Sequence, residues 1–150
     1  PGAQTIELND EYTGEPHSPP TCVKVTYRPG GKRWAGIYAQ YNVKDEGHNW
    51  GIRPGKDLTG YTKLVWYAKG ENGGEMVEFK AGGIDASGMR YKDSFEKSLG
   101  TVRLENTWTR YELDLTGQDL SSVIGAFCWV ATARSNPDGL TFYLDDIFYE

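Results

Sequence analysis

The stretch TFYLDDIFYE, residues Thr141–Glu150, decides the fold class of this chain. Apolar and polar residues alternate from Phe142 onward, as in a strand with one buried face. The acidic pair Asp145-Asp146 then interrupts the run before Ile147 resumes it. Phe142 and Ile147 are five residues apart, an odd spacing, so they share a face only if the strand bulges at the pair. Acidic residues are poor strand formers, and a bound cation is the simplest reason for this pair.

The same two-residue period recurs along most of the chain. It predicts strands over Cys22–Arg28, Trp34–Tyr41, Lys63–Lys69, Met76–Ala81, Thr101–Leu104, Arg110–Leu115 and Ala126–Ala131. Turn sequences separate these runs, as in Asn136-Pro137-Asp138-Gly139, and no long helical pattern occurs. Eight or nine short strands in 150 residues predict an all-β fold, a two-sheet antiparallel β-sandwich of the jelly-roll type.

Length and composition narrow the class of protein. The 150 residues fit one domain with its own core, which we expect to span 1–150 as a module of a longer, exported protein. A net charge of −5 argues against a nucleic-acid partner, and no apolar run is long enough to cross a membrane. We expect an extracellular or cell-surface monomer. Cys22 and Cys128 are able to form a disulfide, but two free buried thiols are favoured.

Three segments resemble one family type. They are TFYLDDI at 141–147, LVWYAKG at Leu64–Gly70 and WTRYELDL at Trp108–Leu115, in the expected order along the chain. Together they are similar to strands of the jelly-roll, galactose-binding-like carbohydrate-binding modules appended to polysaccharide-degrading enzymes. The resemblance implies a non-catalytic module that binds soluble polysaccharide or oligosaccharide chains, of plant or microbial origin, and targets an attached enzyme to them.

The resemblance also implies a structural calcium ion that ties the first strand to the last. Asp145 would be its carboxylate ligand. The partners would come from Thr5–Glu11, where Glu7 and Asn9 share a face, with Asp10 in reserve. Backbone carbonyl groups would complete the six to eight oxygen ligands that calcium takes. The alternative is that these acidic residues are solvated charges that protect a sheet edge from pairing with another chain.

Sugars bind proteins through flat aromatic rings and planar polar side chains. In modules of this type the concave sheet binds a glycan chain, and we expect the strands near residues 34–41, 76–81 and 126–131 to form it. The outward residues expected to bind carbohydrate are Trp34, Tyr38, Gln40, Glu78, Lys80 and Trp129, with Arg103 from a neighbouring strand and Trp50 from a loop. Trp129 loses this role if Cys128 and Val130 face outward instead. Glu78 and Lys80 also fit a solvated ion pair.

Catalysis is the less favoured alternative. A glycosidase needs two carboxyl groups across a cleft, and the sequence offers Glu78 no evident partner. The segment FKAG at 79–82 resembles the core of jelly-roll alginate lyases, but the motifs that accompany it there are absent. His17 and His48 are isolated and predicted to lie at the surface. A protein-interaction or structural module of a cell-surface protein stays open as a further alternative, because the sandwich itself is neutral about its ligand.

Overall fold

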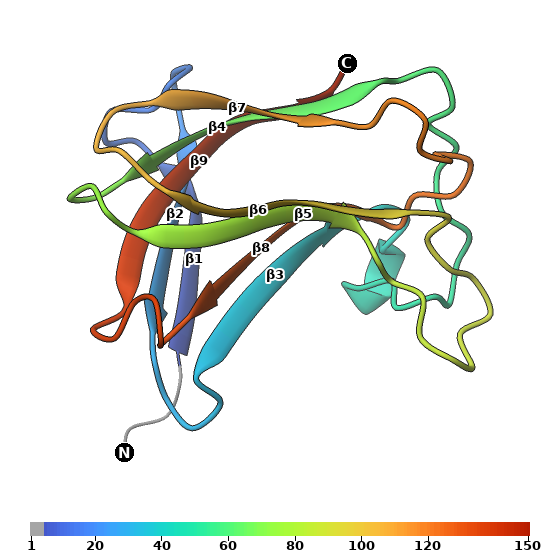
Figure 1. Cartoon of the computed structure of the whole chain (residues 1–150), viewed down its shortest axis with the longest axis horizontal. Coiled ribbons are helices and arrows are strands. Elements are labelled where there is room, and N and C mark those ends of the chain that lie inside the picture. Colours follow the sequence, from blue (N-terminus) through green and yellow to red (C-terminus); the bar gives the residue numbers. More distant parts are fainter. Residues whose placement is uncertain (1–4) are drawn as a thin grey trace.

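The computed structural model describes residues 5–150, which form two antiparallel sheets packed face to face (Figure 1). The larger sheet has the strand order β1-β2-β9-β4-β7. Its strands are β1 (Thr5–Tyr12), β2 (Cys22–Arg28), β9 (Leu140–Tyr149), β4 (Lys63–Gly70) and β7 (Thr109–Asp114). This arrangement confirms the predicted two-sheet sandwich.

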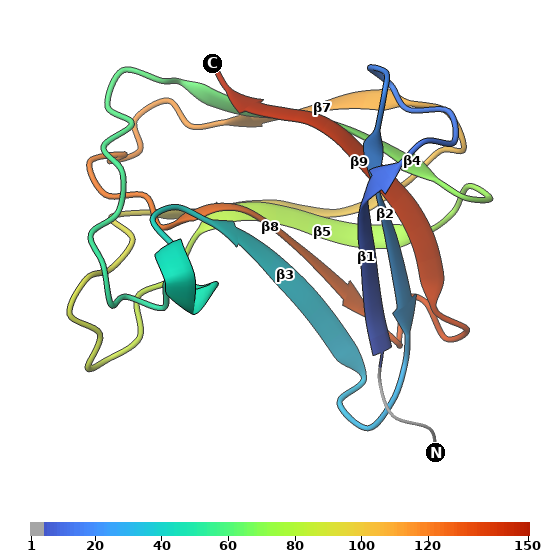
Figure 2. The same ribbon diagram turned by 180° about the vertical axis from the view of Figure 1, so that it is seen from behind.

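The smaller sheet has the order β3-β8-β5-β6. Its strands are β3 (Trp34–Gln40), β8 (Gly125–Thr132), β5 (Met76–Gly82) and β6 (Glu96–Arg103). The long loops after β3 and β5, the first carrying the short 3₁₀ helix η1 (Lys44–Glu46), lie together beyond one end of this sheet (Figure 2). The three strands that the sequence placed together, near residues 34–41, 76–81 and 126–131, are therefore neighbours.

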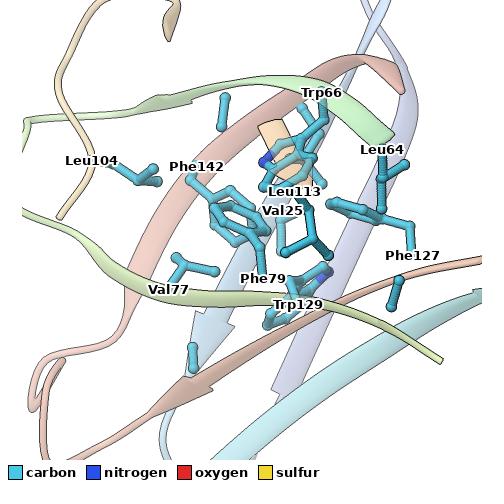
Figure 3. Close-up of a cluster of buried hydrophobic side chains, with 14 of the residues drawn as sticks. Val25, Leu64, Trp66, Val77, Phe79, Leu104, Leu113, Phe127, Trp129 and Phe142 are labelled. Carbon is cyan, nitrogen blue, oxygen red and sulfur yellow. The ribbon is translucent and has the colours of Figure 1, made fainter. Parts of the chain in front are cut away.

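Aromatic rings from both sheets fill the core (Figure 3). Trp66 of β4 lies 5.2 Å from Phe79 of β5, and Phe142 of β9 lies 5.3 Å from Trp129 of β8, measured between ring centroids. All four side chains are buried, and such ring pairs add to the free energy gained by burying their area. This core fixes which face of each strand is left for a ligand.

The bulge predicted in the last strand is present. Tyr67 of β4 pairs with Asp145, and Val65 pairs with Phe148, so β9 holds one residue more than β4 between the two pairs. Asp146 takes a left-handed backbone conformation with φ of 49°, which few non-glycine residues adopt. The odd spacing of the apolar residues was therefore a correct sign of the bulge.

Strand β6 differs from its prediction. The sequence placed a short strand at Thr101–Leu104, whereas β6 begins at Glu96. Phe79 pairs with Gly100 and Lys80 with Ser98, so an extra residue of β6, Leu99, bulges between the pairs. The bulge shifts the two-residue period in mid-strand and hid its first half from the sequence pattern.

The acidic pair at the β9 bulge binds the loop between β1 and β2. One carboxylate oxygen of Asp145 accepts a hydrogen bond from the backbone N–H of Ser18 at 2.9 Å. Asp146 accepts hydrogen bonds from the Ser18 hydroxyl at 2.5 Å and from His17 Nδ1 at 2.7 Å. The His17 ring stacks on Tyr67 at 3.8 Å. These bonds give the pair a structural role in fixing this loop to β9.

The residues predicted to bind calcium do not converge. Glu7 of β1 pairs with Thr26 of β2, and Thr26 pairs with Thr141 of β9. Thr141 precedes Asp145 by four residues, so Asp145 lies about 13 Å further along β9 than the level of Glu7. Glu7 instead forms an ion pair with Arg28 at 3.0 Å, and Asn9 accepts the backbone N–H of Glu11. Within residues 5–150, no three His, Cys, Asp or Glu side chains are placed to hold a metal ion. A calcium ion stays a prediction, without the ligand set proposed for it.

Replacing Asp146 by asparagine is expected to make the stability of the fold depend less on pH under acidic conditions. Hydrogen bonds from Ser18 and His17 lower the pKa of Asp146 below its usual value. A carboxyl group with a lowered folded-state pKa stabilises the fold above its unfolded pKa of about 4, and this stabilisation disappears as the pH falls through the folded value. The melting temperature Tm of the wild type should therefore fall more steeply below about pH 4 than that of the variant. The exposed Asp138→Asn serves as the control; equal slopes in all three proteins would contradict the assignment.

The two cysteines, Cys22 and Cys128, are unbridged and buried, as favoured from the sequence. Among the described residues, no helix has the length and apolar character needed to cross a membrane.

Candidate ligand-binding face

The outward-facing side of the sheet β3-β8-β5-β6, called the outer face below, is the candidate site. Strand pairing arranges its residues in rows across the sheet. One row holds Tyr38, Cys128, Lys80 and Ser98, from β3 to β6. The row beside it holds Gly36, Val130, Glu78 and Thr101, and a further row contains Trp34 opposite Thr132 and Met76 opposite Arg103. Alternation therefore places the predicted Trp34, Tyr38, Glu78, Lys80 and Arg103 on one face.

Aromatic side chains stand along the β3 side of the outer face. Trp34 is 55% exposed at one end of the strand, an unusual exposure for the largest apolar side chain. Tyr38 lies four residues further on, about 13 Å along the strand. The ring of Trp50, from the loop after β3, stands nearly perpendicular to Tyr38 at 5.9 Å and is 47% exposed. The three rings provide stacking surfaces over a length greater than one sugar ring.

Tyr38 reaches across the neighbouring strand β8. Its hydroxyl donates a hydrogen bond to the carbonyl of Gly82 on β5 at 2.9 Å. The ring passes over Gly125 so closely that a Cβ atom there would lie 2.8 Å from it, so this crossing requires glycine. Burial, followed by nearby Cys128, raises the pKa of Tyr38 above its usual value. The ring is thereby fixed across the sheet and neutral at physiological pH.

Polar side chains occupy the β5–β6 side of the outer face. The Ser98 hydroxyl donates to Glu78 at 2.6 Å and holds that carboxylate in place. The ammonium group of Lys80 lies 5.9 Å from the centre of the Tyr38 ring, within cation–π range. In the described part of the chain, neither Lys80 nor Arg103 forms an ion pair. Their N–H groups are thus available to hydroxyl oxygens of a ligand.

Trp129 has to be removed from the predicted ligand residues. Its side chain is 2% exposed and packs in the core against Phe142, because the inward residues of β8 are Phe127, Trp129 and Ala131. The outward residues of this strand include Cys128 and Val130, the alternative that the sequence left open. Cys128 lies beneath the Tyr38 ring, which crosses β8, so Val130 is the partly exposed side chain of this strand between the aromatic side and the polar side of the outer face.

Gln40 also has a different role from the one predicted. Its side-chain oxygen accepts the backbone N–H of Asn49 at 2.7 Å, and its side-chain nitrogen is buried away from a ligand. Asn49 is fully buried and bonds the backbone carbonyls of Tyr41 and Arg53. Gln40 and Asn49 therefore fix the loop that carries Trp50.

Asp93 joins the second loop to the same sheet. This carboxylate is 8% exposed and accepts the backbone N–H groups of Ile84 at 2.9 Å and Ile124 at 2.5 Å. The N–H of Gly125, directly under Tyr38, lies 3.2 Å from both of its oxygens. Burial raises the pKa of Asp93, while these backbone donors oppose the shift. Sequence reasoning did not predict this anchoring role because the partners of Asp93 lie far apart in the chain.

The outer face combines stacking rings, hydrogen-bond donors and one held carboxylate, a mixture that suits polyhydroxylated ligands. Ser98 was missed as a member of this face because its half of β6 was not predicted, and Thr101, although inside the predicted strand, was not named as a ligand residue. The two carboxylates that the strands place here, Glu78 and Glu96, lie on the neighbouring strands β5 and β6. They therefore stand on the same side of β8 and do not oppose each other as in a glycosidase cleft.

Solved structures with the same architecture include carbohydrate-binding modules. A family 11 module from Clostridium thermocellum, in complex with a β-1,3-1,4-mixed-linked tetrasaccharide, gives a TM-score of 0.64 at 12% identity over 98% of this chain and 82% of that one. A family 30 module of a cellulosomal cellulase of Clostridium thermocellum gives 0.56 at 18% identity, over 95% and 80%.

The sequence itself matches no protein-family model. No curated protein matches it either. The similarity is therefore one of structure, and at these identities it establishes the fold. The chain has the fold of the jelly-roll carbohydrate-binding modules, as the three sequence segments implied.

Proposed function

We propose that this chain is a non-catalytic carbohydrate-binding module that holds a soluble polysaccharide or oligosaccharide on its outer face. The observation that carries the proposal is the gathering of Trp34, Tyr38 and Trp50 opposite the polar groups of Glu78, Lys80 and Arg103. Rings stack on the C–H faces of sugars, and the polar groups bond their hydroxyls. Beside the Tyr38 ring, the small residues Gly36 and Val130 lie between Trp34 and the polar side, and a sugar chain would run over them.

The fold supports the same proposal from another direction, since solved proteins that share it bind glycans. In this role the chain would deliver an attached enzyme of a secreted protein to a plant or microbial polysaccharide. It would act as a monomer and would itself cleave nothing. Contacts with sugar hydroxyls exchange with water, so we expect dissociation constants of about a micromolar or weaker.

Native gel electrophoresis with embedded polysaccharide tests the proposal, with mixed-linked β-glucan as the first probe and a broad glycan array beside it. The wild-type protein should be retarded. Trp50→Ala should weaken binding about fivefold, because loss of one stacking ring costs about 1 kcal/mol. Tyr61→Ala serves as the control, since Tyr61 is similarly exposed, at 46%, in a loop off the outer face.

Two results would contradict the proposal. If no glycan on the array binds, the protein-interaction alternative replaces it. If the protein releases reducing or unsaturated ends from a polysaccharide, and Glu78→Gln stops this, the chain is an enzyme.

A further inference from the structure

A shallow apolar pocket, wide open to solvent, lies beside Trp50, at the loop end of the outer face. It has a volume of about 500 Å³ and is lined by residues of two loops, among them Trp50, Ile52, Ala86 and Met89. Ile52 is 49% exposed there although it is a large aliphatic residue. The pocket thus differs in character from the polar side of the outer face.

The two loops that form the pocket are bound to each other. The backbone N–H of Tyr91 donates to the carbonyl of Gly51 at 3.0 Å. A Cβ atom at Gly51 would lie 2.5 Å from the Tyr91 carbonyl and 2.8 Å from Met89, so the loops approach as closely as glycine permits. Asp93 fixes one loop to the sheet, and Asn49 fixes the other. The pocket is therefore built into the fold.

Trp50 connects the pocket to the outer face. The ring of Trp50 lies 5.9 Å from the ring of Tyr38, measured between centroids. Trp50 also lines the pocket. A glycan stacked on Tyr38 would thus bring its substituents next to Ile52 and Met89. Sugar hydroxyls gain nothing from these side chains, whereas the methyl group of an ester substituent would be removed from water there.

We propose that this pocket receives the acyl group of an O-acylated polysaccharide, most simply an acetyl ester, whose backbone lies on the outer face. The proposal rests on the proposed carbohydrate-binding function and names its ligand class. The only charged residue that lines the pocket, Arg90, places its guanidinium group 5.2 Å from the ring of Tyr91, and no acidic residue lines the pocket. The ligand group expected is therefore uncharged and apolar.

Paired polysaccharides test this inference. O-acetylated glucomannan and O-acetylated xylan are each compared with the same sample after mild alkaline removal of the acetyl esters. Burial of one methyl group should make the acetylated form bind about fourfold more tightly. Ile52→Ser should remove this difference, and Met89→Ser should reduce it. Ile147→Ser is the matched control, because Ile147 is 39% exposed on the other sheet, and it should keep the difference.

The outcomes separate the two proposals. If the deacetylated samples bind as tightly as the acetylated ones, the acyl pocket is wrong and the binding function stands. If the preference persists in Ile52→Ser, the pocket is not its source and the inference fails. If none of the four samples binds, the inference fails, and only the glycan array decides whether the binding function fails with it.

Discussion

Replacing Asp93 by alanine is expected to lower the free energy of unfolding by about 3–5 kcal/mol, a large part of the stability of a domain of this size. The carboxylate accepts the backbone N–H groups of Ile84, Ile124 and Gly125, and both isoleucines are buried. Alanine leaves these donors without a partner in the interior, where each loss costs about 1–3 kcal/mol. Urea unfolding measured by tryptophan fluorescence gives the difference directly.

Two further variants make this test specific. Asp93→Asn keeps the shape but turns an N–H₂ group toward backbone donors, so it should also destabilise, by less than alanine. Asp85→Ala is the control on the same loop, because Asp85 is exposed, and it should stay within about 0.5 kcal/mol of the wild type. An Asp93→Ala protein as stable as the control would show that the carboxylate does not hold the loop to the sheet.

The parts of the fold that sequence reasoning found are those that depend on neighbours along the chain. Alternation within a strand is local, so Trp34, Tyr38, Glu78 and Lys80 were assigned to the correct faces before any pairing was known. The same holds for the bulge at Asp145, which the spacing of two apolar residues required. In a strand with one solvent-exposed face and one buried face, the alternation of polar and apolar residues shows which side chains point inward.

Strand β8 shows where this reasoning stops. Phe127, Cys128 and Trp129 are each less than 4% exposed, so both faces of the strand are buried at this point. A central strand that is buried on both faces shows no alternation of polar and apolar residues. The orientation of Trp129 was therefore not determined by the sequence pattern. What buries the outer side is Tyr38, which crosses from β3, a contact that no pattern within β8 contains.

The calcium ligands illustrate the second limit, which is register between strands. Glu7 and Asp145 belong to strands β1 and β9 of the same sheet, as the resemblance implied. Pairing through β2 nevertheless places Glu7 level with Thr141, with Thr26 between them, and Asp145 turns to the Ser18 backbone. A slip of a few residues changes which side chains meet, and sequence patterns of single strands do not determine that slip.

Replacing Tyr38 by alanine is expected to weaken glycan binding about thirtyfold, the effect of losing a central aromatic anchor worth about 2 kcal/mol. Tyr38 lies between Trp50 and the cationic side chain of Lys80, so its ring contributes to both sides of the site. Tyr38→Phe keeps the ring and loses only the hydrogen bond to Gly82. It should bind within about threefold of the wild type and lose about 1 kcal/mol of stability. Isothermal titration with the glycan found on the array measures both affinities.

The thiol of Cys128 reports on the ring of Tyr38 without any ligand. Cys128 is 2% exposed beneath the outer face, and burial raises its pKa to about 12, so it should be inert toward a disulfide reagent at pH 8 in the wild type and in Tyr38→Phe. In Tyr38→Ala the thiol should react, since its cover is removed, while an unchanged far-ultraviolet circular dichroism spectrum shows that the sandwich persists. Cys22, buried on the other sheet, should stay unreactive throughout. A Tyr38→Ala protein whose Cys128 reacts but whose glycan affinity equals that of the wild type would place the ligand somewhere other than the outer face.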